Sequence, residues 1–172
     1  MSAYSTATTQ WGTLTFGLVA GESGLSRVIL PYEWQDPAHP AHRYPVDRQF
    51  LRPWLDQFDA YWANELVGWV GPLDFHGTAF QTKVWQALQD ILPGSVQTYG
   101  EVARRLGNSR AVRAVASAIA HNPLPIIVPC HRVIGARSTL IGYQGGLNLK
   151  EKLLRHEGVH HINPTGHARF AF

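Results

Sequence analysis

Residues 78–123 carry a series of helix start and stop signals that narrows how this part of the chain can fold. Two segments have the Thr-x-x-Glu/Gln spacing of a capping box, which satisfies free backbone N–H groups where a helix begins. Glycine or proline follows each helical stretch, and proline disfavours helix in the residue before it. The start signals are Thr78 with Gln81 and Thr98 with Glu101; the stop signals are Pro93-Gly94, Gly107 and Asn122-Pro123. The pattern predicts three short helices, at about 78–91, 99–106 and 110–120.

The rest of the chain has weaker patterns. Apolar residues alternate at 14–18, and after a Gly-containing turn 25–30 can return as a second strand. Proline-rich 31–47 is expected to be loop, and apolar residues at helical spacing predict helices at about 47–65 and 148–156. A chain with a β-hairpin and several helices belongs to the α/β (α+β) class. Four breakers, Gly68, Gly71, Pro72 and Gly77, predict two domains, 1–78 and 79–172, with a tail from 159.

Composition narrows the functional classes. The chain has 172 residues, 45% of them hydrophobic, so a packed core is expected. Its one cysteine cannot form an internal disulfide or a thiolate zinc cluster, so we expect a reducing, cytoplasmic location, no metal and no cofactor. The sequence has no signal-peptide pattern and no stretch near the ~20 apolar residues of a membrane span, so no membrane partner is expected.

Charge is divided unevenly between the two halves of the chain. Residues 1–79 hold 4 basic and 8 acidic residues, a net charge of −4, whereas 80–172 hold 11 and 4, a net charge of +7. A basic half suggests a polyanionic partner, and the alternative is a lopsided but merely solvated surface.

The helices expected at 99–106 and 110–120 have the lengths and the short turn of a helix-turn-helix. One face of the second helix is apolar, and the opposite face combines arginine with very small side chains. The inward face is Val112, Val115, Ala116 and Ile119; the outward face is Arg110, Arg113, Ala114 and Ser117. Small side chains let a helix approach a surface closely, and guanidinium groups attract phosphate. The outward face is therefore a candidate DNA-binding surface, although paired short helices are more often only structural.

Cys130 lies between an apolar run and two basic residues in IIVPCHRVIG. A thiol reacts as the thiolate, and a free cysteine of pKa ~8.5 needs a nearby base or positive charge to lose its proton at neutral pH. His131 is a candidate base, acting directly or through a water, and Glu157 could orient its ring. The Asn122 amide could hold the turn beneath the thiol. The alternative is a buried cysteine in an apolar strand, the more usual place for a lone cysteine.

Four segments resemble the O6-alkylguanine-DNA alkyltransferases, also called methylated-DNA–protein-cysteine methyltransferases. They are FQTKVWQAL, TYGEVARRLG, RAVRAVASAIAHNPLPIIVPCHRVIG and GYQGGLNLKEKLLRHEG. PCHRV followed by GYxGG and K-x-x-L-L-x-x-E is specific to that family and its close relatives. The resemblance is almost continuous over 79–158 and only general over 1–70. It implies an N-terminal ribonuclease-H-like α/β domain and a C-terminal, mostly helical winged-helix/helix-turn-helix domain.

The resemblance also implies an activity: DNA repair by one irreversible transfer of an alkyl group from O6-alkylguanine in duplex DNA. Cys130 would be the nucleophile and permanent acceptor, and His131, oriented by Glu157, would take its proton. Asn122 would brace the active-site turn. Tyr99 would contact the DNA backbone and protonate the leaving guanine.

The implied partner is double-stranded DNA, bound through the minor groove by a protein that is monomeric in solution. Base flipping brings the lesion to the thiol, and an intercalated arginine fills the gap. The DNA contacts would be Tyr99, Arg110, Arg113, Ala114 and Ser117, with Arg113 entering the duplex. The base pocket would be lined by Pro125, Val133, Tyr143, Gln144, Gly145 and Gly146. The range of alkyl groups, O4-alkylthymine as a second substrate, cooperative assembly on DNA and the role of the tail stay open.

Three positions depart from the family pattern: Val112 stands for a usual alanine, and Ala116 and Ser138 for frequent glycines. None of these changes removes a reacting group. The alternative function closest to the resemblance is an alkyltransferase-like protein that binds the lesion without transfer, but such proteins usually have tryptophan in place of the cysteine. A helix-turn-helix regulator would need longer polar side chains on its recognition helix. A cysteine hydrolase would turn over repeatedly.

Overall fold

The computed structural model describes residues 4–163, and the chain divides into two compact units, Met1–His76 and Gly77–Phe172. The mixed α/β class expected from the sequence is confirmed. The domain boundary expected after residue 78 stays a prediction, and the compact units divide two residues before it. Nothing within residues 4–163 is both long enough and apolar enough to serve as a membrane-crossing helix. The part of the expected tail beyond Asn163 lies outside the described residues.

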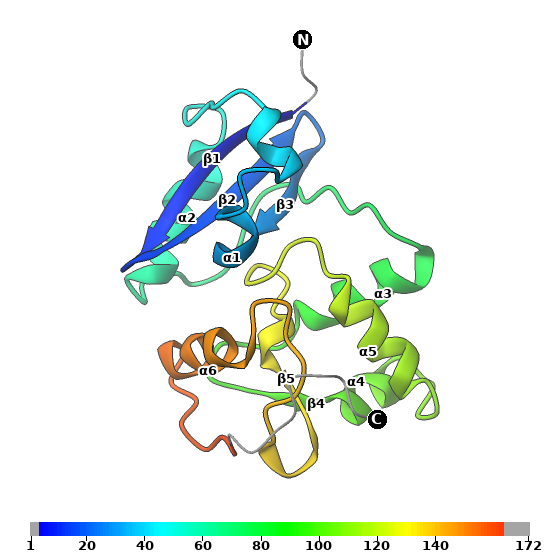
Figure 1. Ribbon diagram of the computed structural model, residues 1–172. Helices are drawn as coiled ribbons and strands as arrows, with labels where there is room; N and C mark the ends of the chain where they lie inside the picture. The colour runs from blue at the N-terminus through cyan, green and yellow to red at the C-terminus, as the bar shows by residue number, and fades with distance from the viewer. Residues whose placement is uncertain (1–3, 164–172) are drawn as a thin grey trace. The chain divides into compact units, whose positions relative to one another are not determined.

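A three-stranded antiparallel sheet forms the centre of the N-terminal unit (Figure 1). Its strands are β1 (Tyr4–Trp11), β2 (Leu14–Gly21) and β3 (Gly24–Ile29), in that order across the sheet. The expected hairpin is therefore present as β2 and β3. The sequence did not predict β1, because its residues are mostly small and polar and show no alternation of apolar side chains.

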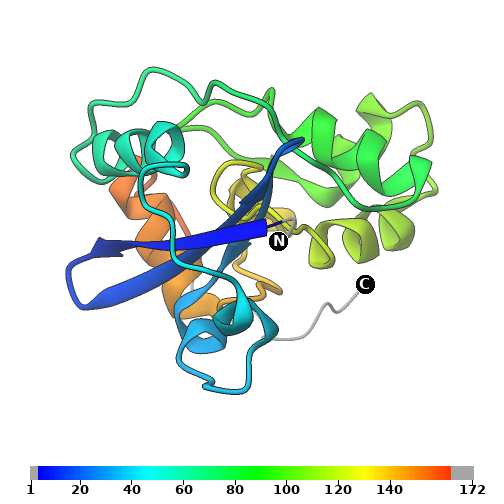
Figure 2. The ribbon, with the colours of Figure 1, turned by 90° about the horizontal axis from the view of Figure 1, so that it is seen from above.

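Both faces of β2 are buried because different segments cover them (Figures 1 and 2). On one face Phe16 packs against Trp62 of α2 (Arg52–Trp62), with ring centroids 5.1 Å apart. On the other face Val19 packs with Ala41 and Trp34. These two residues come from η1 (Pro40–Arg43) and α1 (Pro31–Trp34), which lie on the side of the sheet away from α2. The sheet is thus the core of this unit.

The helix expected at about 47–65 is shorter than predicted. The Asp47 carboxylate accepts a hydrogen bond from the backbone N–H of Phe50 at 2.9 Å, so the residues before α2 form a turn. Pro53 lies in the first helical turn, where a missing N–H costs nothing. At the other end Asn64 takes a left-handed conformation, φ 59°, and terminates the helix.

The C-terminal unit is mostly helical, and both capping boxes are formed as predicted. Figures 1 and 2 show α3, α4 and α5 on one side of a short parallel pair of strands and α6 on the other. The elements are α3 (Ala79–Leu88), β4 (Gln97–Thr98), α4 (Tyr99–Arg105), α5 (Val112–Ala120), η2 (Cys130–Arg132), β5 (Val133–Ile134), η3 (Ala136–Ser138) and α6 (Leu147–His156).

Helix α5 begins two residues later than predicted. The Asn108 side chain accepts a hydrogen bond from the backbone N–H of Arg110 at 3.1 Å, and this turn precedes the helix. Arg110 therefore lies before α5 rather than on it. The inward face is packed as expected, because Val115 and Ile119 are buried and the Trp85 indole donates to the carbonyl of Ala118 at 2.8 Å.

Candidate active site

The segment that delivers Cys130 is a closed turn and not the apolar strand considered from the sequence. The Asn122 amide spans this turn: its Oδ1 accepts from the backbone N–H of Leu124 at 2.9 Å and its Nδ2 donates to the carbonyl of Val128 at 2.8 Å. Between them Ile126 has φ 79°, a conformation that β-branched residues rarely adopt. A strained turn of this kind persists only when its surroundings hold it, which assigns that role to Asn122.

The Cys130 thiol starts the short helix η2 and is almost withdrawn from solvent, with 2% of the residue exposed. Burial raises its pKa, while a hydrogen bond from Asn122 and the positive charge of Lys150 act in the opposite direction. Because the net shift is upward, the resting thiol is protonated at neutral pH. Any reaction as a nucleophile therefore requires a base within the site.

His131 and Glu157 form a buried pair beside this thiol. The Nε2 atom of His131 lies 2.8 Å from Oε1 of Glu157, and since a carboxylate only accepts, Nε2 carries the hydrogen. Nδ1 is then the free lone pair of a neutral ring, and it is buried with no hydrogen-bond partner among residues 4–163. Burial lowers the pKa of His131 more than Glu157 raises it. The imidazole is therefore neutral at pH 7 and able to accept a proton.

Arg132, to which the sequence analysis gave no role, completes this cluster. Its Nε donates to Oε2 of Glu157 and a terminal nitrogen donates to Oε1, both at 2.8 Å. Its other terminal nitrogen donates to the carbonyl of Ile91. Burial raises the pKa of Glu157, but His131 and Arg132 outweigh it and hold that pKa well below its usual range. The sequence did contain a signal for this role. Arg132 follows His131 directly, the half of the chain from 80 to 172 has four acidic residues, and an arginine that is buried needs an acidic partner.

Lys150 is a second charged residue that the sequence analysis did not assign. It is fully buried, and its Nζ donates to the carbonyls of Val133 at 2.6 Å, Ile141 at 2.8 Å and Gly142 at 3.2 Å. Burial lowers its pKa from 10.5 to about 8, and the nearby Cys130 raises it in part. The sequence signal for the burial of Lys150 was the K-x-x-L-L-x-x-E spacing, which places Lys150 on the same face of α6 as the buried leucines.

Tyr99 begins α4 and lies close to the same charges. Lys150 Nζ is 5.9 Å from the centre of its ring, and its hydroxyl is 3.5 Å from the carbonyl of Ile141. Burial first, and the neighbouring Cys130 second, raise the pKa of Tyr99. The phenol is therefore protonated at neutral pH, so it has a hydrogen to donate.

The six residues expected to line a base pocket lie in two segments of this unit. Pro125 and Val133 are buried on either side of Cys130 in the chain. Gln144 is tied to the active-site turn, because its Nε2 donates to the carbonyl of Asn122 at 3.0 Å. Tyr143 is buried, Gly145 is half-buried, and Gly146 is exposed and caps α6 with φ 83°.

The expected DNA contacts other than Tyr99 form a separate, exposed surface. Arg113, Ala114 and Ser117 lie on the solvent side of α5, opposite its buried stripe. Arg110 is also exposed, in the turn that precedes the helix. The structure thus brings the catalytic candidates together and leaves this surface outside their hydrogen-bonded cluster.

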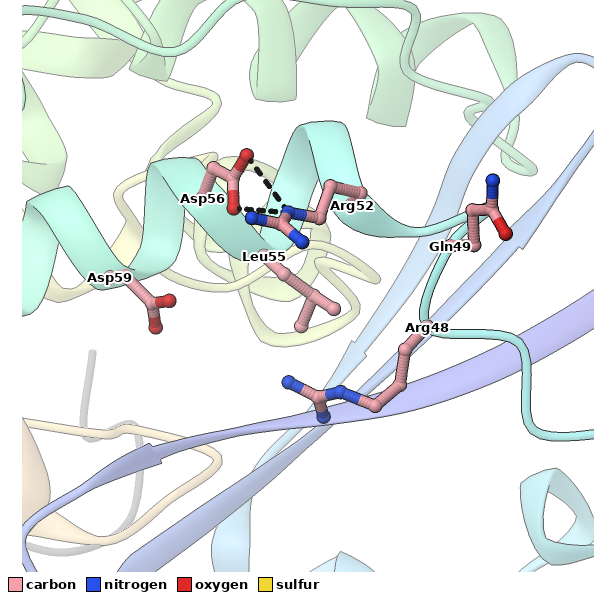
Figure 3. A pocket seen from close by; sticks show the side chains of 6 residues that line it. All are labelled: Arg48, Gln49, Arg52, Leu55, Asp56 and Asp59. Carbon is pink, nitrogen blue, oxygen red and sulfur yellow. Dashed lines mark hydrogen bonds and ion pairs between the residues drawn. The ribbon is translucent and has the colours of Figure 1, made fainter.

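The N-terminal unit contains a hollow of a different character (Figure 3). Arg52 and Asp56, one turn apart on α2, pair at 3.0 Å, and Arg48 donates to the carbonyl of Thr8 at 2.9 Å. The residues that line the hollow are Arg48, Gln49, Arg52, Leu55, Asp56 and Asp59. They include no cysteine, serine or histidine, and their ionisable side chains are exposed. Within residues 4–163, no group of three or more His, Cys, Asp or Glu side chains is placed to hold a metal ion. The Cys130 cluster, which combines a thiol with buried ionisable groups, is therefore the candidate active site.

Comparison with known proteins identifies the family of the chain. Residues 79–159 match the family described as 6-O-methylguanine DNA methyltransferase, DNA binding domain. A methylated-DNA–protein-cysteine methyltransferase of Methanosarcina acetivorans is 43% identical over 135 residues, which are 78% of this chain and 80% of that protein.

Solved structures extend the similarity to the N-terminal unit. A crystal structure of Mycobacterium tuberculosis O6-methylguanine methyltransferase superposes with a TM-score of 0.80 and 38% identity, over 94% of this chain and 96% of that one. The M. tuberculosis protein in complex with DNA gives a TM-score of 0.78 and 39% identity, over 90% and 92% of the two chains. The chain belongs to the methylated-DNA–protein-cysteine methyltransferase family.

Proposed function

We propose that this protein repairs DNA by transferring the alkyl group of O6-alkylguanine to Cys130 in a single, irreversible turnover. The observation that carries the proposal is the neutral, buried imidazole of His131, held by Glu157, next in the chain to a buried thiol. A protonated thiol, a base and an orienting carboxylate are the parts that thiolate chemistry needs.

The reaction follows from the charges of the site. His131 Nδ1 takes the thiol proton, directly or through a water, and the sulfur attacks the alkyl carbon. The C–S bond forms as the C–O6 bond breaks, and the bonding pair stays with the guanine. Protonation by the Tyr99 hydroxyl lets guanine leave as a neutral base, and the proton held by His131 replaces the one that Tyr99 gives up. Overall, Cys130 gains the alkyl group and guanine gains the proton that the thiol gave up.

The charged neighbours favour the ionic stage of this sequence. Lys150 is positive near the sulfur, and Arg132 keeps Glu157 ionised so that Glu157 can stabilise the imidazolium. The product is a thioether, which a thiol cannot displace, and the chain has no second cysteine. Each molecule therefore acts once.

The exposed side of α5 is proposed to bind the minor groove. Arg113 would replace the extruded nucleotide in the base stack, while Ala114 and Ser117 are small enough for close approach to a narrow groove. Arg110, in the turn before the helix, would contact a phosphate.

Mass spectrometry of the intact protein tests the proposal directly. After incubation with a duplex that contains one O6-methylguanine, we expect a gain of about 14 Da on Cys130 and at most one equivalent of repaired base. The Cys130→Ser variant should bind the same duplex without gaining mass, because a hydroxyl is far less acidic than a thiol. Repair beyond one equivalent would indicate a hydrolase, and tight binding of the wild-type chain without transfer would indicate a lesion-binding protein.

A further inference from the structure

We infer that the C-terminal segment 159–163 positions the loop that walls the proposed alkyl pocket and thereby limits the size of the alkyl group that Cys130 accepts, an inference that rests on the proposed transfer reaction. The sequence analysis found no pattern in this segment and gave it no role.

Backbone hydrogen bonds tie the end of this segment to the loop. The N–H of Asn163 donates to the carbonyl of Ser138 at 2.8 Å, and the N–H of Leu140 donates to the carbonyl of Asn163 at 3.1 Å. Asn163 thereby forms a parallel bridge with Thr139. Pro164 follows Asn163 in the sequence, and a residue before proline favours the extended conformation that such pairing needs.

Apolar side chains fix the rest of the segment. Val159 and Ile162 pack against a buried cluster formed by Ile134, Leu140 and Leu154. Leu140 belongs to the loop and Leu154 to α6, so the segment joins the loop to the helix that carries Lys150. The segment is therefore anchored on both its backbone and its side chains.

The loop needs this support because its backbone is strained. Arg137 and Ser138 are consecutive non-glycine residues with φ 57°, in the left-handed region that costs free energy for any residue with a Cβ atom. Within the loop, the N–H of Gly135 donates to the carbonyl of Thr139 at 2.8 Å, and the N–H and hydroxyl of Thr139 donate to the carbonyl of Ala136 at 3.3 and 2.8 Å. The two bonds made by Asn163 lie on either side of Thr139 and hold the strained pair in place.

The loop leads directly to the groups around the thiol. The carbonyls of Ile141 and Gly142, which follow the strained pair, accept hydrogen bonds from Lys150. Gln144, two residues further, is bound to the carbonyl of Asn122. Since Cys130 is 2% exposed, any group that reaches the sulfur must pass the residues that enclose it. A loop held more loosely would position the reacting groups less well and admit larger substituents.

The test compares two substitutions at one position. Asn163→Pro removes the N–H donor to Ser138, whereas Asn163→Ala keeps the donor and removes only the side chain. We expect Asn163→Pro to raise the hydrogen-exchange rates of the Gly135 and Leu140 amides about fivefold, the effect of one net backbone hydrogen bond. The ratio of transfer rates from O6-benzylguanine and O6-methylguanine in duplex DNA should rise by a similar factor. Asn163→Ala measures what the side chain contributes, and it should change both measurements less than Asn163→Pro does.

A rescue variant separates this role from a general loss of stability. Ser138→Gly relieves the strain at one of the two left-handed residues, so in the Asn163→Pro background it should return both the exchange rates and the ratio of transfer rates part of the way toward wild type. An Asn163→Pro protein that keeps wild-type exchange rates, or that exchanges faster with an unchanged ratio, overturns the inference. A wild-type chain that transfers no alkyl group overturns the proposed function, and the size selection with it.

Discussion

His131 Nε2 and Glu157 Oε1 are 2.8 Å apart, and their side chains are 0% and 2% exposed. Arg132 binds the same carboxylate through two nitrogens. Glu157 therefore contacts one residue that is always charged and one that would be charged only during the proposed reaction. In the resting site the negative charge of Glu157 faces the positive charge of Arg132. In the proposed reaction His131 would accept the thiol proton, so that the three groups would carry two positive charges and one negative charge, and the ionised thiol would add the second negative charge.

Glu157→Gln should therefore affect both catalysis and stability. We expect alkyl transfer to slow by roughly 10²-fold, the lower end of a general-base contribution, and its pH–rate profile to move to higher pH because the imidazolium loses its counter-charge. Leaving Arg132 buried without its partner should lower the free energy of unfolding by about 3–5 kcal/mol. Single-turnover kinetics across pH and urea unfolding measure the two effects separately.

The pH dependence of that stability loss has a defined direction. The pKa of Glu157 is lower in the folded state than in the unfolded state, so its contribution is complete above an unfolded pKa of ~4.3 and is lost as pH falls below it. The difference between wild type and Glu157→Gln should therefore shrink in acid. Glu151→Gln is the control, since Glu151 is more exposed and pairs with Arg155 one helical turn away. An unchanged pH–rate profile in Glu157→Gln would remove Glu157 from the proton relay.

Asn122→Asp removes the hydrogen-bond donor of the Asn122 side chain and keeps the acceptor. An aspartate can still accept from the N–H of Leu124, but its second oxygen faces the carbonyl of Val128 with no hydrogen to share. We expect a loss of about 1–3 kcal/mol in the free energy of unfolding and slower transfer, because the thiol also loses an amide that lowers its pKa. Asn108→Asp is the matched control: its Oδ1 also accepts a backbone N–H, at an exposed turn. Equal effects of the two substitutions would contradict the role of Asn122.

Much of the C-terminal unit could be predicted because its signals are local. A capping box places acceptor and donor three residues apart. Thr78 and Thr98 therefore predict where α3 and α4 begin even when the fold is not known. The start of α5 was misplaced because the side chain of Asn108 bonds to the turn and not to the helix. Ile126 shows the opposite limit: its intrinsic preference opposes φ 79°, and the conformation depends on the tertiary surroundings, which include the Asn122 hydrogen bonds across the turn.

The catalytic candidates were predictable by chemistry, whereas their supports were not. A thiol calls for a base and a base for a carboxylate, which led to Cys130, His131 and Glu157. The roles of Arg132 and Lys150 depend on which distant carbonyls and carboxylates enclose them, and no local pattern states that. Asn163, at the end of the segment 159–163, is bound to the loop at 138–140 through backbone hydrogen bonds. Backbone hydrogen bonds do not depend on a particular side chain, so the sequence does not predict this pairing.

Lys150→Met should change how stability depends on pH. The pKa of Lys150 falls from 10.5 to about 8 on folding, so the unfolded chain binds more protons between these values and wild-type stability gains as pH rises through them. Methionine has a similar length and no charge. The free energy of unfolding of wild type, minus that of Lys150→Met, should therefore increase by up to about 3 kcal/mol from pH 8 to pH 10.5. A pH-independent difference in chemical unfolding would show that Lys150 keeps its usual pKa.

Arg113→Ala tests the proposed part of α5 in base flipping. The Arg113 side chain is exposed on the solvent side of α5 and is not part of the hydrogen-bonded cluster around Cys130, so its loss should leave the folded protein and the reactivity of Cys130 intact. Transfer from O6-methylguanine in duplex DNA should slow by roughly tenfold, because the gap in the base stack is no longer filled. Transfer from free O6-benzylguanine should change by less than about twofold, since no base has to be flipped.

Arg110→Ala provides the comparison, because Arg110 is proposed to contact phosphate and not to enter the duplex. That variant should bind DNA more weakly and reduce the salt dependence of binding by about one ion, while transfer at saturating DNA stays near the wild-type rate. Single-turnover rates with both substrates, together with binding titrations at several salt concentrations, distinguish the two arginines. If Arg113→Ala slowed transfer equally from duplex and from free base, Arg113 would have to act on the thiol or its pocket, and intercalation would be wrong.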